Sequence, residues 1–376
     1  MTQTYRVPMS APDIQPEDIA LVTEALQSGV LSGGPFLDRL EGAFADYVGT
    51  RHAVAVSSGT AGLHLCVRAA GVADGDEVIT TPFSFIASAN CLLYERATPV
   101  FVDIDETTFN LDPALVEAAV TKRTRAVLPV HVFGEPCEMD ALGAICRDRD
   151  LTLIEDACEA VGAEYRGRKI GTFGKAAVFA FYPNKQMTMG EGAIITTDDA
   201  DWAGLLRSLR NQGRAEAGAW LSHERLGYNY RLDEMSAALG LSQLRRLDAL
   251  LARRDAVAGL YDAHLHRVPG VSLRGPTPST ARRSRFAYVI QLHPGVDRDR
   301  VIDQLEREGI PTRVYFSPIH LQPFYRERFG FSEGDFPVAE RVAASTLALP
   351  FHANLSPGDV ARVADALSAA VTRTAA

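Results

Sequence analysis

Apolar, β-rich runs recur along the first two-thirds of the chain, and helix-compatible segments separate most of them. The runs are HAVAVSS (52–58), DEVITT (76–81), TPVFVDID (98–105), TRAVLPVHV (124–132), LTLIED (151–156), AAVFAF (176–181) and GAIITT (192–197). This alternation is typical of an α/β fold with a mostly parallel, seven-stranded sheet covered by helices on both faces. The last two runs lie too close together for a crossover helix, so we expect one of them to break the parallel order.

The pattern changes in the last third of the chain. Residues 232–260 predict one long amphipathic helix with Asp233 near its start, although the leucines of this segment need only be core residues. Beyond it, FAYVIQL (286–292), DRDRVIDQLEREG (297–309) and PTRVYF (311–316) predict a smaller α+β unit. We therefore expect a large α/β domain with an N-terminal arm over residues 1–250 and a small C-terminal α+β domain over residues 251–376.

Composition and charge agree with an enzyme of this size and narrow its partners. The 376 residues are 47% hydrophobic, which is enough for a large core and two domains. A formal net charge of -9 argues against nucleic acid and against anionic membranes as partners. Arg282, Arg283 and Arg285 form a local exception, which either meets an anionic substrate or is a solvated turn.

Cysteine usage and apolar run lengths predict a cytoplasmic protein without a metal site. The five cysteines include no CxxC pair and no metal-ligand spacing, and their odd number suits a reducing compartment. The first 18 residues have no apolar core of the signal-peptide kind, and no later run is long enough to span a bilayer.

Two residues at predicted strand ends point to one kind of chemistry. Lys185 follows the run 176–181 and precedes a Gly-rich turn, and Asp156 ends the run 151–156. A lysine amine can hold the aldehyde of pyridoxal 5'-phosphate, and a carboxylate can keep the pyridine nitrogen protonated, which makes the ring an electron sink. Either residue taken alone is commonplace, as a loop lysine or as an acid that closes a strand. Together they predict a pyridoxal-phosphate site.

A turn after the first run is a candidate phosphate site. Residues 57–61, Ser-Ser-Gly-Thr-Ala, lead from the run 52–58 into an apolar-periodic helix. Free N–H groups at a helix N-terminus can bind a phosphate, and Gly59 allows a close approach. Such a sequence is also an ordinary helix cap. Because ligands of open α/β sheets gather at the carboxyl ends of strands, the combination with Lys185 and Asp156 favours the phosphate reading.

Further segments extend this pattern along nearly the whole chain. They are SGVLSGGPFLDRLEGAFADYVG, SSGTAGLHL, TPFSFIASAN, VHVFGEPCEMDAL, IEDACEAVGAEYRGRKIGTFG, FAFYPNKQMTMGEGAIITT, LGYNYRLDEMSAALGLSQLRRLD and YFSPIHLQPFY. In content and order they resemble the DegT/DnrJ/EryC1/StrS aminotransferases. The segments around Lys185 and around NYR are the specific ones.

The resemblance implies a fold-type I pyridoxal-phosphate transferase that works as a homodimer with shared active sites. Such an enzyme takes an amino group from L-glutamate or glutamine, passes through pyridoxamine 5'-phosphate, and aminates a keto group of a nucleotide-linked sugar or a keto-cyclitol. The resemblance also implies individual roles. Lys185 and Asp156 match the catalytic pair, and the matches for cofactor binding are Ser58, Gly59, Thr60, Ala61, Phe85, Glu159 and Asn229, with Asn229 reaching the phosphate of the other subunit.

Two positions depart from the pattern of this family. Ala180 stands where a serine often binds phosphate, so Ser57, Thr60 and Asn229 must carry more of that contact. Glu159 stands where glutamine or histidine is common near the ring hydroxyl. An anion there would be repelled by a phenolate, so we hypothesise that Glu159 is protonated or turned away.

Candidate substrate residues follow from position. Tyr182, Tyr315 and His320 are candidates for substrate contacts, each with a packing role as the alternative, and His131 either lines the site or is a satisfied core histidine. Residues 211–231 read as a long functional loop from which Arg231, with Trp220 and His223, would face the neighbouring subunit's substrate.

Two rival functions use the same scaffold. A cofactor-dependent dehydratase or deoxygenase is disfavoured by Lys185, because the relatives of that kind carry histidine there. A sensory or regulatory protein that binds the cofactor without turnover is the other rival. No DNA-binding motif or basic arm accompanies the fold in the sequence, which disfavours direct gene regulation.

Overall fold

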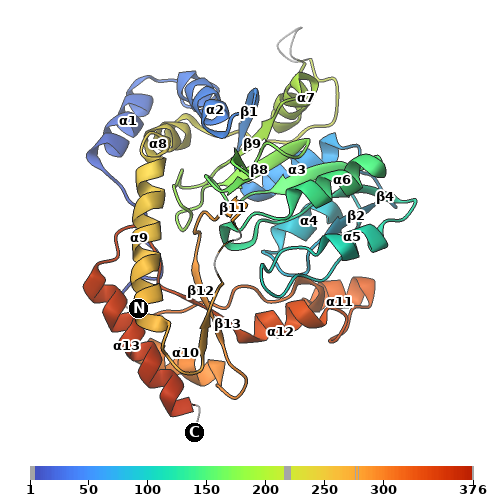
Figure 1. Cartoon of the computed structure of the whole chain (residues 1–376). Coiled ribbons are helices and arrows are strands. Elements are labelled where there is room, and N and C mark those ends of the chain that lie inside the picture. The colour runs from blue at the N-terminus through green and yellow to red at the C-terminus, as the bar shows by residue number, and fades with distance from the viewer. Residues whose placement is uncertain (1–4, 216–221, 276, 278, 375–376) are drawn as a thin grey trace.

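The seven predicted runs form the central sheet of the protein (Figure 1). A computed structural model describes residues 5–215, 222–275, 277 and 279–374. In spatial order the strands are β1 (His52–Val56), β9 (Ala193–Thr197), β8 (Ala176–Ala180), β5 (Thr152–Asp156), β4 (Thr124–Val127), β2 (Glu77–Thr80) and β3 (Thr98–Phe101). Strand β9 pairs antiparallel with both neighbours, and its Ala193 lies opposite Val56 of β1 and Ala180 of β8. The expected break in the parallel order is confirmed, and β9 is the strand that makes it.

Alternate side chains of the strands pack into two apolar layers. In β1, Ala53 and Ala55 belong to one buried cluster, whereas Val54 and Val56 belong to the other. The first cluster includes residues of α1 (Pro16–Gln27), α2 (Pro35–Val48), α5 (Pro113–Ala119), α6 (Met139–Asp148) and α8 (Glu234–Leu244). The second includes residues of α3 (Gly59–Ala69), α4 (Ala87–Leu93), α7 (Ala200–Arg210) and α12 (Pro337–Ser345). The sheet is thus covered on both faces, as the sequence predicts.

The single helix predicted over residues 232–260 is wrong, because the segment is broken into two. Helix α8 ends at Leu244, and α9 (Leu247–Leu265) begins after Arg246, whose φ of -120° and ψ of 15° are not helical. The Arg246 guanidinium binds the carboxylates of Asp13 and Asp18 in the N-terminal segment. Asp233 caps α8 by accepting a hydrogen bond from the Ser236 N–H at 2.9 Å.

A second, antiparallel sheet lies beyond α9. It has the order β10 (Val271–Leu273), β12 (Tyr288–Leu292), β13 (Thr346–Leu349), and it packs with α9, α10 (Arg298–Arg307) and α13 (Pro357–Thr374) in a third buried cluster. Residues 311–316 form no strand, and their backbone makes only an isolated bridge from Arg313 to Ala348. Val7 also packs in this cluster, so the N-terminal segment reaches both units, and the boundary at residue 250 stays a prediction.

The remaining short elements connect these layers. They are β6 (Glu164–Tyr165), β7 (Arg168–Lys169) and β11 (Ala281–Arg282), which form a small sheet, and η1 (Val132–Gly134), η2 (Ile319–Leu321) and α11 (Pro323–Phe329). All five cysteines are free thiols, and four of them are buried. Among the described residues, none of the helices is both long and apolar enough to cross a membrane. Nor does the described part of the chain gather three or more His, Cys, Asp or Glu side chains in a metal-binding arrangement.

Candidate active site

A cavity of about 440 Å³ opens at the carboxyl ends of the parallel strands. Asp156 ends β5, Ala180 ends β8, and Ser58 follows β1, so each reaches the cavity from a different strand. Most residues predicted for the site line this cavity. They are Ser58, Gly59, Thr60, Phe85, Asp156, Glu159, Tyr182, Lys185 and Tyr315. Its volume lies within the range of about 300–1,000 Å³ that is usual for small-molecule sites.

The Asp156 carboxylate is held in one orientation at the floor of the cavity. Its Oδ2 accepts a hydrogen bond from the Ser88 hydroxyl at 2.7 Å, and its Oδ1 accepts one from the Cys158 N–H at 3.1 Å. The side chain is buried. The two donors fix the orientation of the buried carboxylate and leave it able to accept a further hydrogen bond from the cavity.

Lys185 lies in the turn between β8 and β9, and its side chain is directed at the acidic side of the cavity. The turn is closed by a hydrogen bond from the Lys185 N–H to the Tyr182 carbonyl at 2.9 Å. The Nζ lies 3.7 Å from Glu159 Oε1 and 4.0 Å from the centre of the Phe286 ring. The amine is therefore held between a carboxylate and an aromatic face.

Glu159 connects the cavity to a strained turn behind it. Its Oε2 accepts a hydrogen bond from the Phe133 N–H at 2.8 Å, and Phe133 has a left-handed φ of 55°. Burial raises the pKa of the Glu159 carboxyl, and the nearby Lys185 charge only partly opposes that rise. The direction agrees with the hypothesis of a protonated Glu159, which stays a hypothesis.

The N-terminus of α3 also lines the cavity. Ser58 caps the helix, because its Oγ accepts a hydrogen bond from the Ala61 N–H at 3.1 Å. The N–H groups of Gly59 and Thr60 belong to the first turn, where a helix offers them no carbonyl partner. A Cβ on Gly59 would come within 2.9 Å of Ala180 Cβ, so the close approach needs glycine. Ala61 differs from its predicted role, since it is buried, its N–H is taken by Ser58, and it does not line the cavity.

The predicted partner-facing residues lie outside this cavity. Asn229 is exposed and makes a backbone bridge with Asn211, and Arg231 donates a hydrogen bond to Asn211 Oδ1 at 3.0 Å. His223 is exposed, with its Nδ1 2.9 Å from the Gln212 carbonyl oxygen. Trp220 lies outside the described residues.

Two predicted histidines are buried away from the cavity. His131 places Nε2 3.4 Å from Glu155 Oε2 and accepts the Cys137 N–H on Nδ1, so it is a satisfied core residue. His320 is also fully buried, with Nε2 3.0 Å from Glu340 Oε1. The structure therefore does not place His320 where it could contact substrate in this cavity, in contrast to the prediction.

The arginine cluster also lies away from the cavity. Arg283 pairs with Glu135, Arg285 lies 3.5 Å from Asp255, and Arg282 lies 3.7 Å from Glu164. Each guanidinium is thus engaged by a carboxylate of this chain, which leaves the solvated-turn interpretation as the better one for Arg282.

Comparisons with known proteins agree with this geometry. Residues 12–368 match the profile of the DegT/DnrJ/EryC1/StrS aminotransferase family. The chain belongs to this family. It is 43% identical to the spore coat polysaccharide biosynthesis protein SpsC of Bacillus subtilis, over 97% of both chains. It is 41% identical to the GDP-perosamine synthase of Caulobacter vibrioides, over 98% of this chain and 99% of the relative.

The fold agrees with that of solved members of the DegT/DnrJ/EryC1/StrS family. The crystal structure of S. venezuelae DesV, solved in complex with a ketimine intermediate, superposes with a TM-score of 0.90. The two sequences are 38% identical, and the match covers 97% of this chain and 98% of DesV. The protein is thus a fold-type I aminotransferase by both sequence and structure.

Several cavity residues escaped the sequence analysis, among them Ser88, Phe286, Asn184 and Glu191. Ser88 fixes Asp156, Phe286 packs on Lys185, and Asn184 and Glu191 lie beside the lysine turn. Glu191 carried a readable signal, because it is a charged residue between two glycines in the lysine turn. Phe286 has no such signal in the sequence, because this residue lies just before β12, about a hundred residues downstream of the lysine.

The donor set of the cavity fits pyridoxal phosphate, the cofactor of this family. Gly59 leaves room for a close approach to the helix N-terminus, and Asp156 offers a fixed carboxylate. The buried Asn184 Oδ1, beside the lysine, has no hydrogen-bond partner among the described residues. A buried acceptor of this kind normally has a partner, so a bound group at this place would satisfy it.

Proposed function

We propose that the protein is a pyridoxal-phosphate-dependent aminotransferase that moves the amino group of L-glutamate or glutamine to a keto group of a nucleotide-linked sugar. The observation that carries this proposal is the single cavity that contains Lys185 Nζ, the fixed Asp156 carboxylate and the open N-terminus of α3. Lysine, carboxylate and anion site are the three attachments that this cofactor needs.

Each attachment has a role that its surroundings favour. The bound cofactor would supply an electron sink for the carbon that loses its proton. Asp156 would hold the protonated pyridine nitrogen, and the N–H groups of Gly59 and Thr60 would bind the phosphate, with Phe85 packed on the ring. Lys185 would hold the cofactor and then, once displaced by a substrate amine, move the proton between donor carbon and cofactor carbon.

A sugar acceptor is supported by the relatives and by the shape of the entrance. Two relatives are named for spore coat polysaccharide and for GDP-perosamine, which are both sugar products. Tyr182 is half exposed at the cavity and Tyr315 lines it, so both can meet a substrate that enters from solvent. Glu191 adds a carboxylate that can accept hydrogen bonds from sugar hydroxyls.

The charge balance of the cavity supports a homodimer with shared sites. The charged residues that line it are Asp156, Glu159, Glu191 and Lys185. Lys185 is the one cationic side chain among the described lining residues and is assigned to the cofactor aldehyde, so no cationic side chain of the same protomer is left for a phosphate or for the carboxylate of an amino-acid donor. We propose that Asn229 and Arg231 of the partner subunit supply the missing contacts, with Arg231 bidentate on a carboxylate or phosphate.

We further propose the cytoplasm as the compartment of the protein, because five free thiols suit a reducing environment.

The visible spectrum of the protein reconstituted with pyridoxal phosphate tests the proposal. Addition of L-glutamate should remove the absorbance of the lysine-bound cofactor and produce that of pyridoxamine phosphate. Lys185→Ala should abolish both this change and turnover, with the fold intact by circular dichroism. Turnover with keto-sugar nucleotides then identifies the acceptor class, and activity on keto-cyclitols alone would replace it. A lysine-bound band that never responds to any amino donor would leave the regulatory alternative, and undiminished turnover of Lys185→Ala would remove the proposal.

A further inference from the structure

A buried polar cluster joins α3 to the segment that carries Asn229. His64 on α3 and Glu95 after α4 place Nε2 and Oε1 2.8 Å apart, with 4% and 8% of their side chains exposed. Tyr228 donates its hydroxyl hydrogen to Glu95 Oε1 at 3.1 Å, and the Tyr230 hydroxyl lies 3.2 Å from His64 Nδ1. The two tyrosine rings are stacked, with centroids 5.2 Å apart.

The protonation pattern of this cluster satisfies all four side chains. Burial lowers the pKa of His64, so the ring is neutral near pH 7 and can donate from one nitrogen only. With the proton on Nε2, His64 donates to Glu95 and accepts the Tyr230 hydroxyl on Nδ1. The second oxygen of Glu95 accepts from Arg68 at 2.8 Å. A fully satisfied buried network is rigid, whereas a partly satisfied one is costly.

The register of the segment points Asn229 the other way. Asn229 makes an isolated antiparallel backbone bridge with Asn211, and alternate side chains of extended backbone face opposite sides. Tyr228 and Tyr230 face α3, which leaves Asn229 exposed on the outer side. Backbone hydrogen bonds from Tyr228 to Leu209 at 2.7 Å and from Ser57 to the Tyr230 carbonyl at 2.9 Å fix the chain at both ends.

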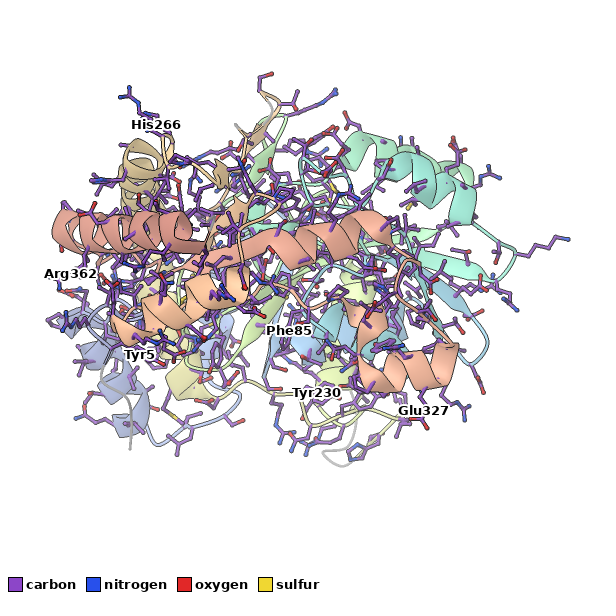
Figure 2. All side chains as sticks on the ribbon, turned by 90° about the horizontal axis from the view of Figure 1, so that it is seen from below. Tyr5, Phe85, Tyr230, His266, Glu327 and Arg362 are labelled. Carbon is purple, nitrogen blue, oxygen red and sulfur yellow. The ribbon has the colours of Figure 1, made fainter. Side chains whose placement is uncertain are left out.

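Helix α3 therefore contributes both to the cavity and to the buried cluster. Its N-terminus lies at the cavity of its own protomer, and one turn further on His64 and Arg68 hold the buried cluster. Figure 2 labels Tyr230, which belongs to this segment, and Phe85, which lines the cavity. Any shift of α3 would move the exposed Asn229 with it.

Resting on the proposed function and its shared sites, we propose that His64, Glu95, Tyr228 and Tyr230 form a positioning cluster that holds Asn229 for the cofactor phosphate of the neighbouring protomer. These residues touch neither cofactor nor substrate. They act through Asn229, and they connect the phosphate turn of one active site to a phosphate contact of the other.

A double-mutant cycle tests whether the cluster acts through Asn229. Tyr228→Phe keeps the ring stack but removes the hydrogen bond to the Glu95 carboxylate, and Glu95→Gln removes its charge. Each should raise the dissociation constant for pyridoxal phosphate about tenfold, the size expected for a hydrogen bond to a charged group. In an Asn229→Ala background the same changes should add almost nothing. Full additivity would overturn the proposal, as would an Asn229→Ala protein that binds the cofactor normally.

Tyr94→Phe is the matched control. Its ring packs on His64 with centroids 5.1 Å apart, yet its hydroxyl makes no hydrogen bond within the described part of the chain. The variant should bind the cofactor as the unmodified protein does. A tenfold loss in this control equal to that of Tyr228→Phe would mean that the effect reports general packing, which contradicts the proposal.

Tagged heterodimers test whether the cluster affects cofactor binding in its own protomer or in the partner protomer. One subunit carries Lys185→Ala, so that only the other subunit can form the lysine-bound absorbance. Tyr228→Phe placed in the Lys185→Ala subunit should weaken cofactor binding at the intact site, and the same change in the intact subunit should not. The opposite pattern, or a monomeric protein, would overturn the inference. Failure of the unmodified protein to bind pyridoxal phosphate would instead remove the proposed function itself.

Discussion

At the scale of single residues, Glu159 stands between opposing forces. Burial disfavours its negative charge, while Lys185 at 3.7 Å and the Phe133 N–H favour it, and the net effect raises its pKa. A carboxyl whose pKa is raised on folding contributes its stability below the unfolded pKa and loses it as pH rises through the folded one. Without bound cofactor, the protein should therefore be less stable at alkaline pH on account of this residue.

We predict that Glu159→Gln stabilises the cofactor-free protein at pH 8 relative to the unmodified chain. The amide oxygen can still accept the Phe133 N–H, and no charge is buried. The advantage should shrink as the pH falls toward 5, because the raised pKa increasingly favours the protonated, uncharged carboxyl there. Thermal denaturation between pH 5 and 8 measures the difference, and a gap that widens toward acid would contradict this account.

Gly59 gives a second test at this scale. A Cβ there would lie 2.9 Å from Ala180 Cβ and 3.1 Å from Cys158 Sγ. Gly59→Ala should therefore destabilise the protein by about 1–3 kcal/mol through overpacking and should weaken cofactor binding. Gly42→Ala, in the helix α2 and with no atom near the added Cβ, should be neutral or stabilising by about 0.5–1 kcal/mol. Urea denaturation compares the pair, and equal effects would remove the steric argument.

The roles of individual site residues could be predicted from the sequence where the motif was local. Lys185 and Asp156 each follow an apolar strand, so the sequence alone places both at the same sheet edge. Phe286 and Ser88 could not be found in this way, because their importance comes from a contact made across the fold. His320 shows the reverse error, since a histidine in the polar and aromatic segment YFSPIHLQPFY is buried against Glu340.

At the scale of elements, the break between α8 and α9 is what periodicity could not reveal. The apolar pattern continues through Arg245 and Arg246, so a single helix was the natural prediction. Arg246 leaves the helical conformation and binds Asp13 and Asp18, which come from the far end of the chain. The seven strands of the central sheet were predicted correctly because β-branched runs and loop lengths are local signals, whereas this junction is set by a contact distant in sequence.

Arg246→Leu should destabilise the protein by about 3 kcal/mol. It removes the guanidinium paired with Asp18 and one of the two paired with Asp13, the other being Arg253; the side chains of Asp13 and Asp18 are 4% and 0% exposed. Arg245→Leu changes the neighbouring, exposed arginine and should have little effect. Chemical denaturation at pH 7 measures both. Equal stabilities of the two variants would show that the ion pairs do not hold the junction.

At the scale of the whole molecule, several large apolar side chains are exposed, and two of them bear on the proposed dimer. Leu226 is 72% exposed within the segment that carries Asn229, and Phe85 is 62% exposed at the cavity. Isolated apolar side chains on a surface are ordinary, but these two belong to parts of the chain for which we propose shared active sites. Burying them against a second copy would close the cavity from solvent.

Leu226→Glu should therefore weaken dimerisation and, with it, cofactor binding. The added carboxylate would have to be desolvated against the partner. Leu115→Glu, on α5 and also exposed at 44%, is the control and should leave both properties unchanged. Sedimentation velocity with and without pyridoxal phosphate gives the measurement. A dimer unaffected by Leu226→Glu would place the interface elsewhere.

The antiparallel strand β9 has a consequence for which ligands can fit. Ala193 lies opposite Val56, just before the phosphate turn, and also opposite Ala180, just before the lysine turn. Two inter-strand steps of about 4.8 Å thus set the ends of β1 and β8, from which the two turns start, about 10 Å apart. Because the spacing between strands of a sheet is nearly fixed, the protein should bind only cofactors whose length matches it. An analogue with an extra methylene between ring and phosphate would then reach one turn but not both.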